Sequence, residues 1–213
     1  MTASRDEFDR SLEVIEAKVI ELFAMITEGL PRTVQALLGA DSEALVLAGR
    51  ERLIDALYLE VESLASREIL LQAPVAVDLR FLLSVLRVTP ELERSHDLIT
   101  QVADRTGLAA PGGGLTPRAR VLAVRMGDLA ATMWRQAADA WYHRDRSAAV
   151  GLTERGQQMN ALRATLAAEL AAGQETVQAA MEMTLVAHCY QRLGAHALNI
   201  ARRVTYLAGP PAR

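Results

Sequence analysis

LERSHD at residues 92–97 recurs 98 residues later as YQRLGA at residues 190–195, and this internal repeat decides the fold. The arginine in the third place is kept in both copies. The two carboxylates of the first copy, Glu93 and Asp97, are replaced in the second copy by an amide and a methyl group. The repeat predicts a molecule of two similar halves. The loss of the acids predicts that only the first half carries carboxylate chemistry.

The composition favours a helical protein. The chain has 213 residues, enough for one large domain or for two domains of roughly 100 residues. Hydrophobic residues make up 51% of the chain and aromatic residues only 4%, a balance that favours helices over a β-sandwich. The formal net charge of −3 gives no general attraction to nucleic acid or to anionic lipid, so neither is expected as a partner.

The chain ends and the single cysteine indicate a cellular location. Cys189 is the only cysteine, which excludes an internal disulfide and a cysteine-rich metal site. The first residues open a charged amphipathic stretch and do not resemble a signal peptide. No apolar run approaches the roughly 20 residues that a membrane-spanning helix needs. We therefore expect a soluble, cytoplasmic protein.

Helical periodicity dominates the first half of the chain. Apolar side chains recur in steps of three and four over residues 8–37, the pattern of a long bundle helix. A turn at residues 39–42 precedes a second helix, and residues 72–74 end that helix before a third one runs to about residue 104. The apolar stripe of the third helix passes through Leu79, Leu83 and Leu86.

The second half repeats this organisation after a linker. Residues 106–116 contain one proline and three consecutive glycines, the composition of a loop. Thr116 and Pro117 then form a favourable N-cap and first-turn pair. The spacing of apolar residues predicts three more helices, at about residues 117–142, 146–172 and 175–207.

The two halves match as three helices plus three helices. Asp41 aligns with Asp145, and the segment around Asp55 aligns with the one around Asn160. Short turns favour antiparallel neighbours. The predicted fold is therefore all-α, with six long helices in two tandem antiparallel three-helix bundles packed side by side. The expected domains are a first repeat at residues 1–105, the linker at 106–116 and a second repeat at 117–213.

Two acidic pairs are candidate metal ligands. Glu93 and Asp97 lie four residues apart and share a helix face, which we expect to continue the apolar stripe of the third helix. Glu51 and Asp55 form a similar pair on the preceding helix. If the two helices are neighbours, four carboxylates face one pocket, a donor set that suits hard or borderline divalent ions. His96 is a possible additional ligand.

Structural roles compete with metal binding for these residues. Arg52, Arg87 and Arg94 are placed to neutralise acids on the same helices, which is the usual fate of paired acids. Thr89 and Pro90 fit the cap and first turn of a new helical segment, in which Glu93 would complement the helix dipole. The sequence leaves both readings open for the acids, and it makes His188 and His196 weak candidates as ligands.

Few other features suggest chemistry. The glycines of the linker follow no strand and precede no lysine, so they do not form a phosphate-binding loop. No nucleophile and base stand in a recognisable arrangement. Trp134, Trp141 and Tyr142 lie in one predicted helix and indicate core or interface packing. Arg202 and Arg203 near the end of the last helix are expected to complement its dipole.

Several of these motifs resemble the PhoU family. DLR at residues 78–80 followed by LERSHD is similar to the family's first-repeat pattern, Asp-Leu-Arg and then Leu-Glu-Arg-Ile-Gly-Asp. RLGAHALNI at residues 192–200 resembles the second-repeat pattern, and QAPVAVDLR at residues 72–80 resembles the stretch between the second and third helices. The resemblance covers nearly the whole chain, including its duplication. Ser95 and His96 depart from the family's Ile-Gly.

The resemblance implies a function by contact with other proteins. It implies a cytoplasmic regulator that couples the ATPase subunit of a phosphate ABC transporter to a sensor histidine kinase and keeps phosphate-starvation signalling off when phosphate is plentiful. Such a protein would not be an enzyme, would reach the membrane only through its partners, and would form a homodimer.

The resemblance also implies metal binding through Glu-x-x-x-Asp motifs. Glu93 and Asp97 match that motif, and Glu51 and Asp55 occupy its acidic positions on the second helix. The corresponding residues of the second repeat have no carboxylate: they are Gly156, Asn160, Gln191 and Ala195. We therefore expect a divalent or trivalent ion, iron or zinc, in the first repeat only.

Two alternatives belong to other functional classes. The first is a carboxylate-bridged di-iron enzyme, because Glu93 and His96 have the Glu-x-x-His spacing. The second repeat lacks that motif, so the di-iron set is incomplete. The second alternative is a paralogue that has kept the fold and changed its partner.

Overall fold

The computed structural model describes residues 2–105 and 107–209, in which helices are joined by turns and loops and no β-strand occurs. Six long helices and one short helix, α2, follow one another, which confirms the all-α prediction. They are α1 (Thr2–Leu37), α2 (Asp41–Ala48), α3 (Glu51–Gln72), α4 (Ala76–Ala103), α5 (Pro117–His143), α6 (Ala148–Ala171) and α7 (Val177–Leu207).

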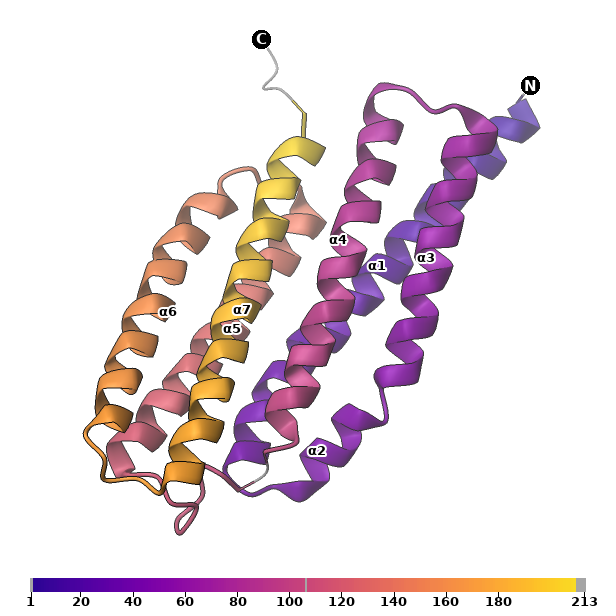
Figure 1. Ribbon diagram of the computed structural model, residues 1–213. Helices are drawn as coiled ribbons and strands as arrows, with labels where there is room; N and C mark the ends of the chain where they lie inside the picture. The colour runs from indigo at the N-terminus through magenta and orange to yellow at the C-terminus, as the bar shows by residue number, and fades with distance from the viewer. Residues whose placement is uncertain (1, 106, 210–213) are drawn as a thin grey trace.

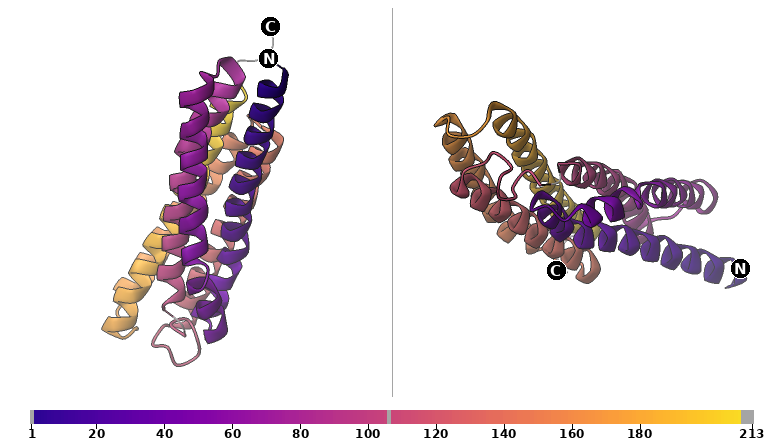
Figure 2. Two further views of the ribbon diagram at one scale, coloured as in Figure 1. Left: turned by 90° about the vertical axis from the view of Figure 1, so that its right-hand side faces the viewer. Right: turned by 90° about the horizontal axis from the view of Figure 1, so that it is seen from below.

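The long helices form two three-helix bundles side by side, as predicted (Figure 1). The first bundle consists of α1, α3 and α4, and the second of α5, α6 and α7. The bundles meet at a joint where α4 lies along α7 and α1 lies along α5, so that α3 and α6 form the two outer edges. Figure 2 shows the same arrangement from the side and from below.

The second predicted helix is interrupted in the structure. The sequence predicted one helix from the turn at residues 39–42, but α2 ends at Ala48 and α3 begins at Glu51. Leu47 of α2 is buried and lies close to Gly29 of α1, where a Cβ would come within 3.2 Å of the Leu47 side chain. The short helix thus packs against α1 through Leu47.

Helix α4 runs without interruption through Pro90. The Thr89 hydroxyl donates a hydrogen bond to the carbonyl oxygen of Val85, 2.8 Å away, within the preceding turn. Thr89 therefore does not cap a new helix, and of the readings that the sequence left open, a second segment starting at Pro90 is excluded. Glu93 lies in the helix interior, so dipole complementarity at a helix start is not its role.

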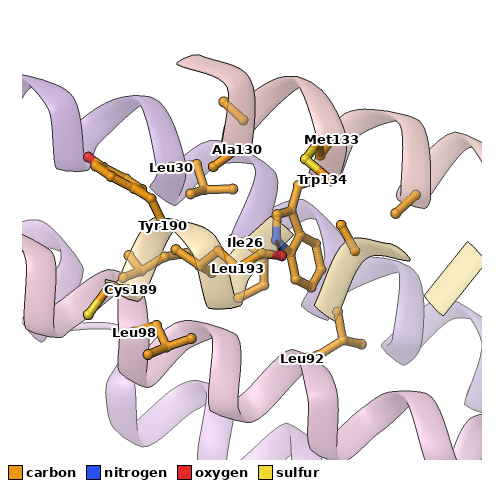
Figure 3. Close-up of a cluster of buried hydrophobic side chains, with 14 of the residues drawn as sticks. Ile26, Leu30, Leu92, Leu98, Ala130, Met133, Trp134, Cys189, Tyr190 and Leu193 are labelled. Atoms are coloured by element: carbon orange, nitrogen blue, oxygen red, sulfur yellow. Dashed lines mark hydrogen bonds between the residues drawn. The ribbon is translucent and has the colours of Figure 1, made fainter. Parts of the chain in front are cut away.

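One hydrophobic core extends through both bundles. Figure 3 shows its centre, where side chains of α1, α4, α5 and α7 point toward one another. The Trp134 indole nitrogen donates a hydrogen bond to the Leu193 carbonyl oxygen at 2.9 Å. Phe23 of the first bundle packs against both Trp134 and Trp141 of the second. The two tryptophans are core residues, as predicted, whereas Tyr142 is exposed.

The connection between the bundles is packed against helix ends. The backbone nitrogen of Ala109 donates to the carbonyl oxygen of Leu37 at 2.8 Å, and Ala109 is fully buried. Thr116 caps α5 as predicted, since its hydroxyl accepts a hydrogen bond from the Ala119 backbone nitrogen at 3.1 Å. Residues 1, 106 and 210–213 of the predicted ranges lie outside the described residues. That each repeat is a domain of its own stays a prediction.

None of the described helices combines the length and the apolar character that crossing a bilayer requires.

Candidate functional site

The two acids of the first repeat lie at the rim of the buried face of α4. Asp97 is exposed and Glu93 is half-buried, so the prediction that both continue the core stripe is wrong. The leucines used to draw that stripe are themselves only half-buried. Because α4 contacts α1, α3 and α7, its buried arc is wide, and those leucines mark one edge of it. The centre of the arc passes through Val85, Leu92 and Ile99.

The structure nevertheless brings the predicted acids of two helices onto one surface. Glu51 and Asp55 are exposed at the start of α3, which packs beside α4. Partial burial and the negative charges of Asp97 and Asp55 raise the pKa of Glu93, and Arg94 opposes this rise. The acids of α3 and α4 are therefore within electrostatic reach of one another. We call Glu51, Asp55, Glu93 and Asp97 the acidic cluster.

His96 lies under the acidic cluster. Its side chain is only 2% exposed, and its Nε2 atom is buried with no hydrogen-bond partner in the part of the chain that the structure describes. Burial lowers the pKa of His96, although the charges of Asp97, Glu51 and Asp55 work in the opposite direction. Burial therefore favours the neutral imidazole, the form in which histidine binds a metal ion.

The chemistry of these donors suits a metal ion, but their present positions do not form a ligand set. Within residues 2–105 and 107–209, no three His, Cys, Asp or Glu side chains are close enough together to hold an ion. Among the same residues, no carboxylate of the acidic cluster forms an ion pair with arginine, so the expected neutralisation by Arg52, Arg87 or Arg94 is not seen. The cluster is an anionic surface without direct ion pairs among the described residues, with the charge of Arg94 acting on Glu93 and a buried imidazole beside it.

The equivalent surface of the second repeat is neutral. The Gln191 side-chain nitrogen donates a hydrogen bond to the Asn160 side-chain oxygen at 2.7 Å, joining α7 to α6. These two residues align with Glu93 and Asp55 of the first repeat. They line a pocket of about 460 Å³ together with Gly156 and Ala195. Where the first repeat has carboxylates on both helices, the second repeat thus has two amides, which join the helices by a direct hydrogen bond.

The joint between the bundles contains a polar contact that sequence reasoning missed. His196 of α7 is buried, and its Nδ1 atom lies 2.8 Å from the Ser95 hydroxyl oxygen of α4. Its Nε2 atom lies 3.5 Å from a carboxylate oxygen of Glu91. Burial lowers the pKa of His196. The negative charge of Glu91 raises it, and the positive charges of Arg192 and Arg94 lower it by smaller amounts. Ser95 and His196 thus link the two repeats.

The signal for this contact was present in the sequence. Ser95 stands where the family pattern has isoleucine, and a polar residue on the buried face of a helix requires a partner. The Ser95 hydroxyl donates to the carbonyl oxygen of Glu91 at 2.6 Å within α4, but its second partner, His196, belongs to the other bundle, so spacing along one helix does not reveal that contact.

Fold and site together define a class of protein: a tandem pair of three-helix bundles with one acidic and one neutral copy of the same inter-helix surface. The model of the PhoU domain matches this chain twice, at residues 19–106 and 123–204, once in each bundle. The chain belongs to the PhoU family.

Curated relatives match over most of their length. A "Phosphate-specific transport system accessory protein PhoU homolog" of Zymomonas mobilis is 29% identical over 206 residues, which are 94% of this chain and 86% of that protein. A protein of the same name from Caulobacter vibrioides is 31% identical over 165 residues, 76% of this chain and 71% of that one.

A solved structure shares the fold. The crystal structure of PhoU from Pseudomonas aeruginosa superposes with a TM-score of 0.86 at 23% identity, covering 94% of this chain and 98% of the other. At this level of identity the likeness extends to the fold and confirms the arrangement of tandem helical bundles.

Proposed function

We propose that the protein regulates phosphate uptake and phosphate-starvation signalling by binding other proteins. The observation that carries this proposal is the match of the PhoU model to both bundles, together with relatives named as accessory proteins of a phosphate-specific transport system. The proposed partners are the ATPase subunit of a phosphate ABC transporter and a sensor histidine kinase. The proposed effect is to keep starvation signalling off when phosphate is plentiful.

The proposed mechanism needs surfaces and no catalytic centre. The two acid-bearing helices of the first bundle, α3 and α4, have exposed outer faces on which a partner can dock. The protein is accordingly proposed to be a non-enzymatic adaptor, in keeping with the accessory role in the names of its relatives. We further propose that it is cytoplasmic, acts as a homodimer and meets the membrane only through its partners.

Co-purification tests the partners. The tagged full-length chain is co-expressed with the phosphate transporter ATPase subunit or the sensor kinase of its own organism, and the bound fraction is quantified. Retention of either partner supports the proposal. If the tagged chain retains neither partner but does retain a subunit of an unrelated membrane system, the protein is a paralogue that has changed its partner. Light scattering coupled to size exclusion measures the oligomeric state, and a monomer at all concentrations would contradict the homodimer.

We also propose one metal site, in the first repeat only, that takes up iron or zinc. Glu51, Asp55, Glu93 and Asp97 would hold the ion, and His96 is the candidate nitrogen donor. The support is the donor chemistry: four carboxylates without ion-pair partners among the described residues, and a buried imidazole without a hydrogen bond. Bound there, the ion would supply positive charge that fixes α3 against α4.

Elemental analysis of protein purified without chelator tests the metal site. The double variant Glu93→Ala/Asp97→Ala is expected to lose the bound ion. The matched double variant Asn160→Ala/Gln191→Ala changes the equivalent positions of the second repeat and is expected to keep it. An equal metal content in the two double variants would contradict the proposed metal site.

A further inference from the structure

A groove along the joint between the bundles concentrates positive charge. It lies between α4 and α7, the two helices that run side by side at the centre of Figure 1, and has a volume of about 710 Å³. Four arginines line it, Arg87 and Arg94 from α4 and Arg202 and Arg203 from α7. We call it the arginine groove. Arg202 and Arg203 were expected to complement the helix dipole, but the last turn of α7 contains no basic residue.

The arginines of the groove are not used to hold the fold together. Among the described residues, none of the four forms an ion pair or a hydrogen bond, although other arginines of the chain do. The one carboxylate in the lining is Glu91, which faces the imidazole of His196. Four guanidinium groups against one carboxylate leave a clear excess of positive charge in a protein whose net charge is −3.

Local sequence and tertiary packing together create the groove. Arg87 and Arg94 are seven residues apart, or two helical turns, so both lie on the same side of α4 and about 10 Å apart along its axis. Arg202 and Arg203 lie on α7 just beyond Asn199, whose amide also lines the groove. Because α4 and α7 belong to different repeats, the groove exists only when the two bundles are docked.

We propose that the arginine groove binds a small anion with at least two phosphoryl groups, either an inorganic polyphosphate or the phosphate tail of a nucleotide. Guanidinium groups form paired hydrogen bonds with phosphoryl oxygens and stay charged at any physiological pH. Positive charge spread over about 10 Å matches linked phosphoryl groups better than a single phosphate ion. The volume lies within the usual range for small-molecule sites. The Asn199 amide adds an uncharged donor.

Anion binding in the arginine groove is independent of the proposed regulation through partner proteins. A protein that binds transporter and kinase needs no phosphorylated ligand, and a groove that binds one can exist without those partners. The ligand would bridge α4 and α7, so its binding would also stabilise the docking of the two bundles.

Calorimetric titration of the full-length protein tests the groove, with pyrophosphate and with ATP as separate probes, in low salt and without divalent ions. Binding of pyrophosphate as tightly as ATP identifies the polyphosphate as the recognised part. Binding of ATP alone identifies a nucleotide. In either case affinity is expected to fall steeply as salt rises. Inorganic phosphate is expected to bind at least about tenfold more weakly, because it reaches fewer guanidinium groups.

Charge variants locate the binding. The double variant Arg94→Gln/Arg203→Gln is expected to weaken binding at least about tenfold, the scale for the loss of charge-assisted hydrogen bonds. Glu91→Gln removes the only carboxylate in the lining and is expected to tighten binding, a direction that a damaged fold would not give. The control Arg67→Gln removes an exposed arginine of α3, outside the groove, and is expected to bind like the parent. Absence of binding to both probes, or equal affinity in the double variant and the control, would overturn the proposal.

Discussion

At the scale of single residues, a missing side chain lets three helices pack together at the joint. Gly127 of α5 faces Val34 of α1 and Tyr190 of α7, and a Cβ at Gly127 would overlap the Val34 side chain and lie 2.9 Å from the Tyr190 hydroxyl oxygen. That hydroxyl lies 2.9 Å from the hydroxyl of Thr33, fully buried between the bundles. The small residue therefore sets the distance between three helices.

Gly127→Ala is expected to destabilise the protein. The added methyl group must displace packed side chains on both bundles, which costs about 1–3 kcal/mol in a well-packed core. Denaturant unfolding measures the change. Gly151→Ala in α6 is the matched control, because a Cβ there meets nothing within 4 Å, so alanine should stabilise the helix by about 0.5–1 kcal/mol. Equal effects of the two substitutions would contradict this account.

His196 makes stability depend on pH. Burial holds the pKa of His196 below its ordinary value of 6.5, so the folded state binds fewer protons than the unfolded state when the pH falls through that value. The stability that His196 contributes is complete above pH 6.5 and is lost as the pH falls toward its folded pKa. The loss from one such group is at most about 1.4 kcal/mol per pH unit.

The variant His196→Gln tests this linkage. Its melting temperature is expected to fall less than that of the parent between pH 7.5 and pH 5.5, because one buried group no longer takes up a proton on unfolding. His188→Gln is the control, since His188 lies on the same helix and is exposed. An identical pH dependence in the parent and in His196→Gln would exclude the proposed role.

The residues of the candidate site were only partly predictable. The repeat and its lost acids pointed to Glu93 and Asp97 on α4 and to Glu51 and Asp55 on α3. These pairs can be read from the sequence because the two acids of each pair are four residues apart on one helix. The burial of His96 and the contact of His196 with Ser95 were not visible, because each depends on a helix from elsewhere in the chain. The arginine groove was missed for the same reason: half of its charge comes from each repeat.

At the scale of elements, helix ends were predicted better than helix faces. Thr116 was recognised as the cap of α5 and Gly-rich residues as the linker, since both signals are local. The break before α3 was missed because a single glycine, Gly49, is tolerated within a helical pattern. The buried face of α4 was centred on its edge, because three half-buried leucines at the edge of a wide buried arc resemble its centre in the sequence.

The Thr116 cap gives a test at this scale. Thr116→Ala removes the acceptor for the Ala119 backbone nitrogen and the donor to Glu175, 2.9 Å away, and is expected to cost about 1 kcal/mol. Thr165→Ala within α6 is the control, because its exposed hydroxyl only donates back to Ala161. Thermal unfolding compares the two, and a loss in Thr165→Ala as large as that in Thr116→Ala would rule out a specific capping effect.

At the scale of the whole molecule, the two repeats share one core rather than holding two. Aromatic rings of the first bundle, Phe23 and Phe81, pack against Trp141 of the second. Arg144 at the end of α5 covers the Phe81 and Trp141 rings and pairs with Glu16 of α1. Separating the bundles would expose this surface to water, so each bundle stabilises the other.

Unfolding is therefore expected to be a single cooperative transition, although the sequence is a tandem repeat. Both tryptophans of the chain lie in α5 and pack against Phe23 of α1, so tryptophan fluorescence reports the second bundle and its contact with the first, whereas far-ultraviolet circular dichroism reports the helices of both bundles. A shared core predicts that the two signals change at the same denaturant concentration.

A shared core also predicts the effect of Ile26→Ala, which truncates a fully buried side chain in α1 of the first bundle. This variant is expected to lower the fluorescence midpoint as much as the dichroism midpoint. The free energy of unfolding of Ile26→Ala is expected to be lower than that of the parent by about 2–5 kcal/mol. Two separate midpoints, or a fluorescence midpoint that Ile26→Ala leaves unchanged, would mean that the bundles unfold independently. In that case the joint would be an interface between two domains and not part of one core.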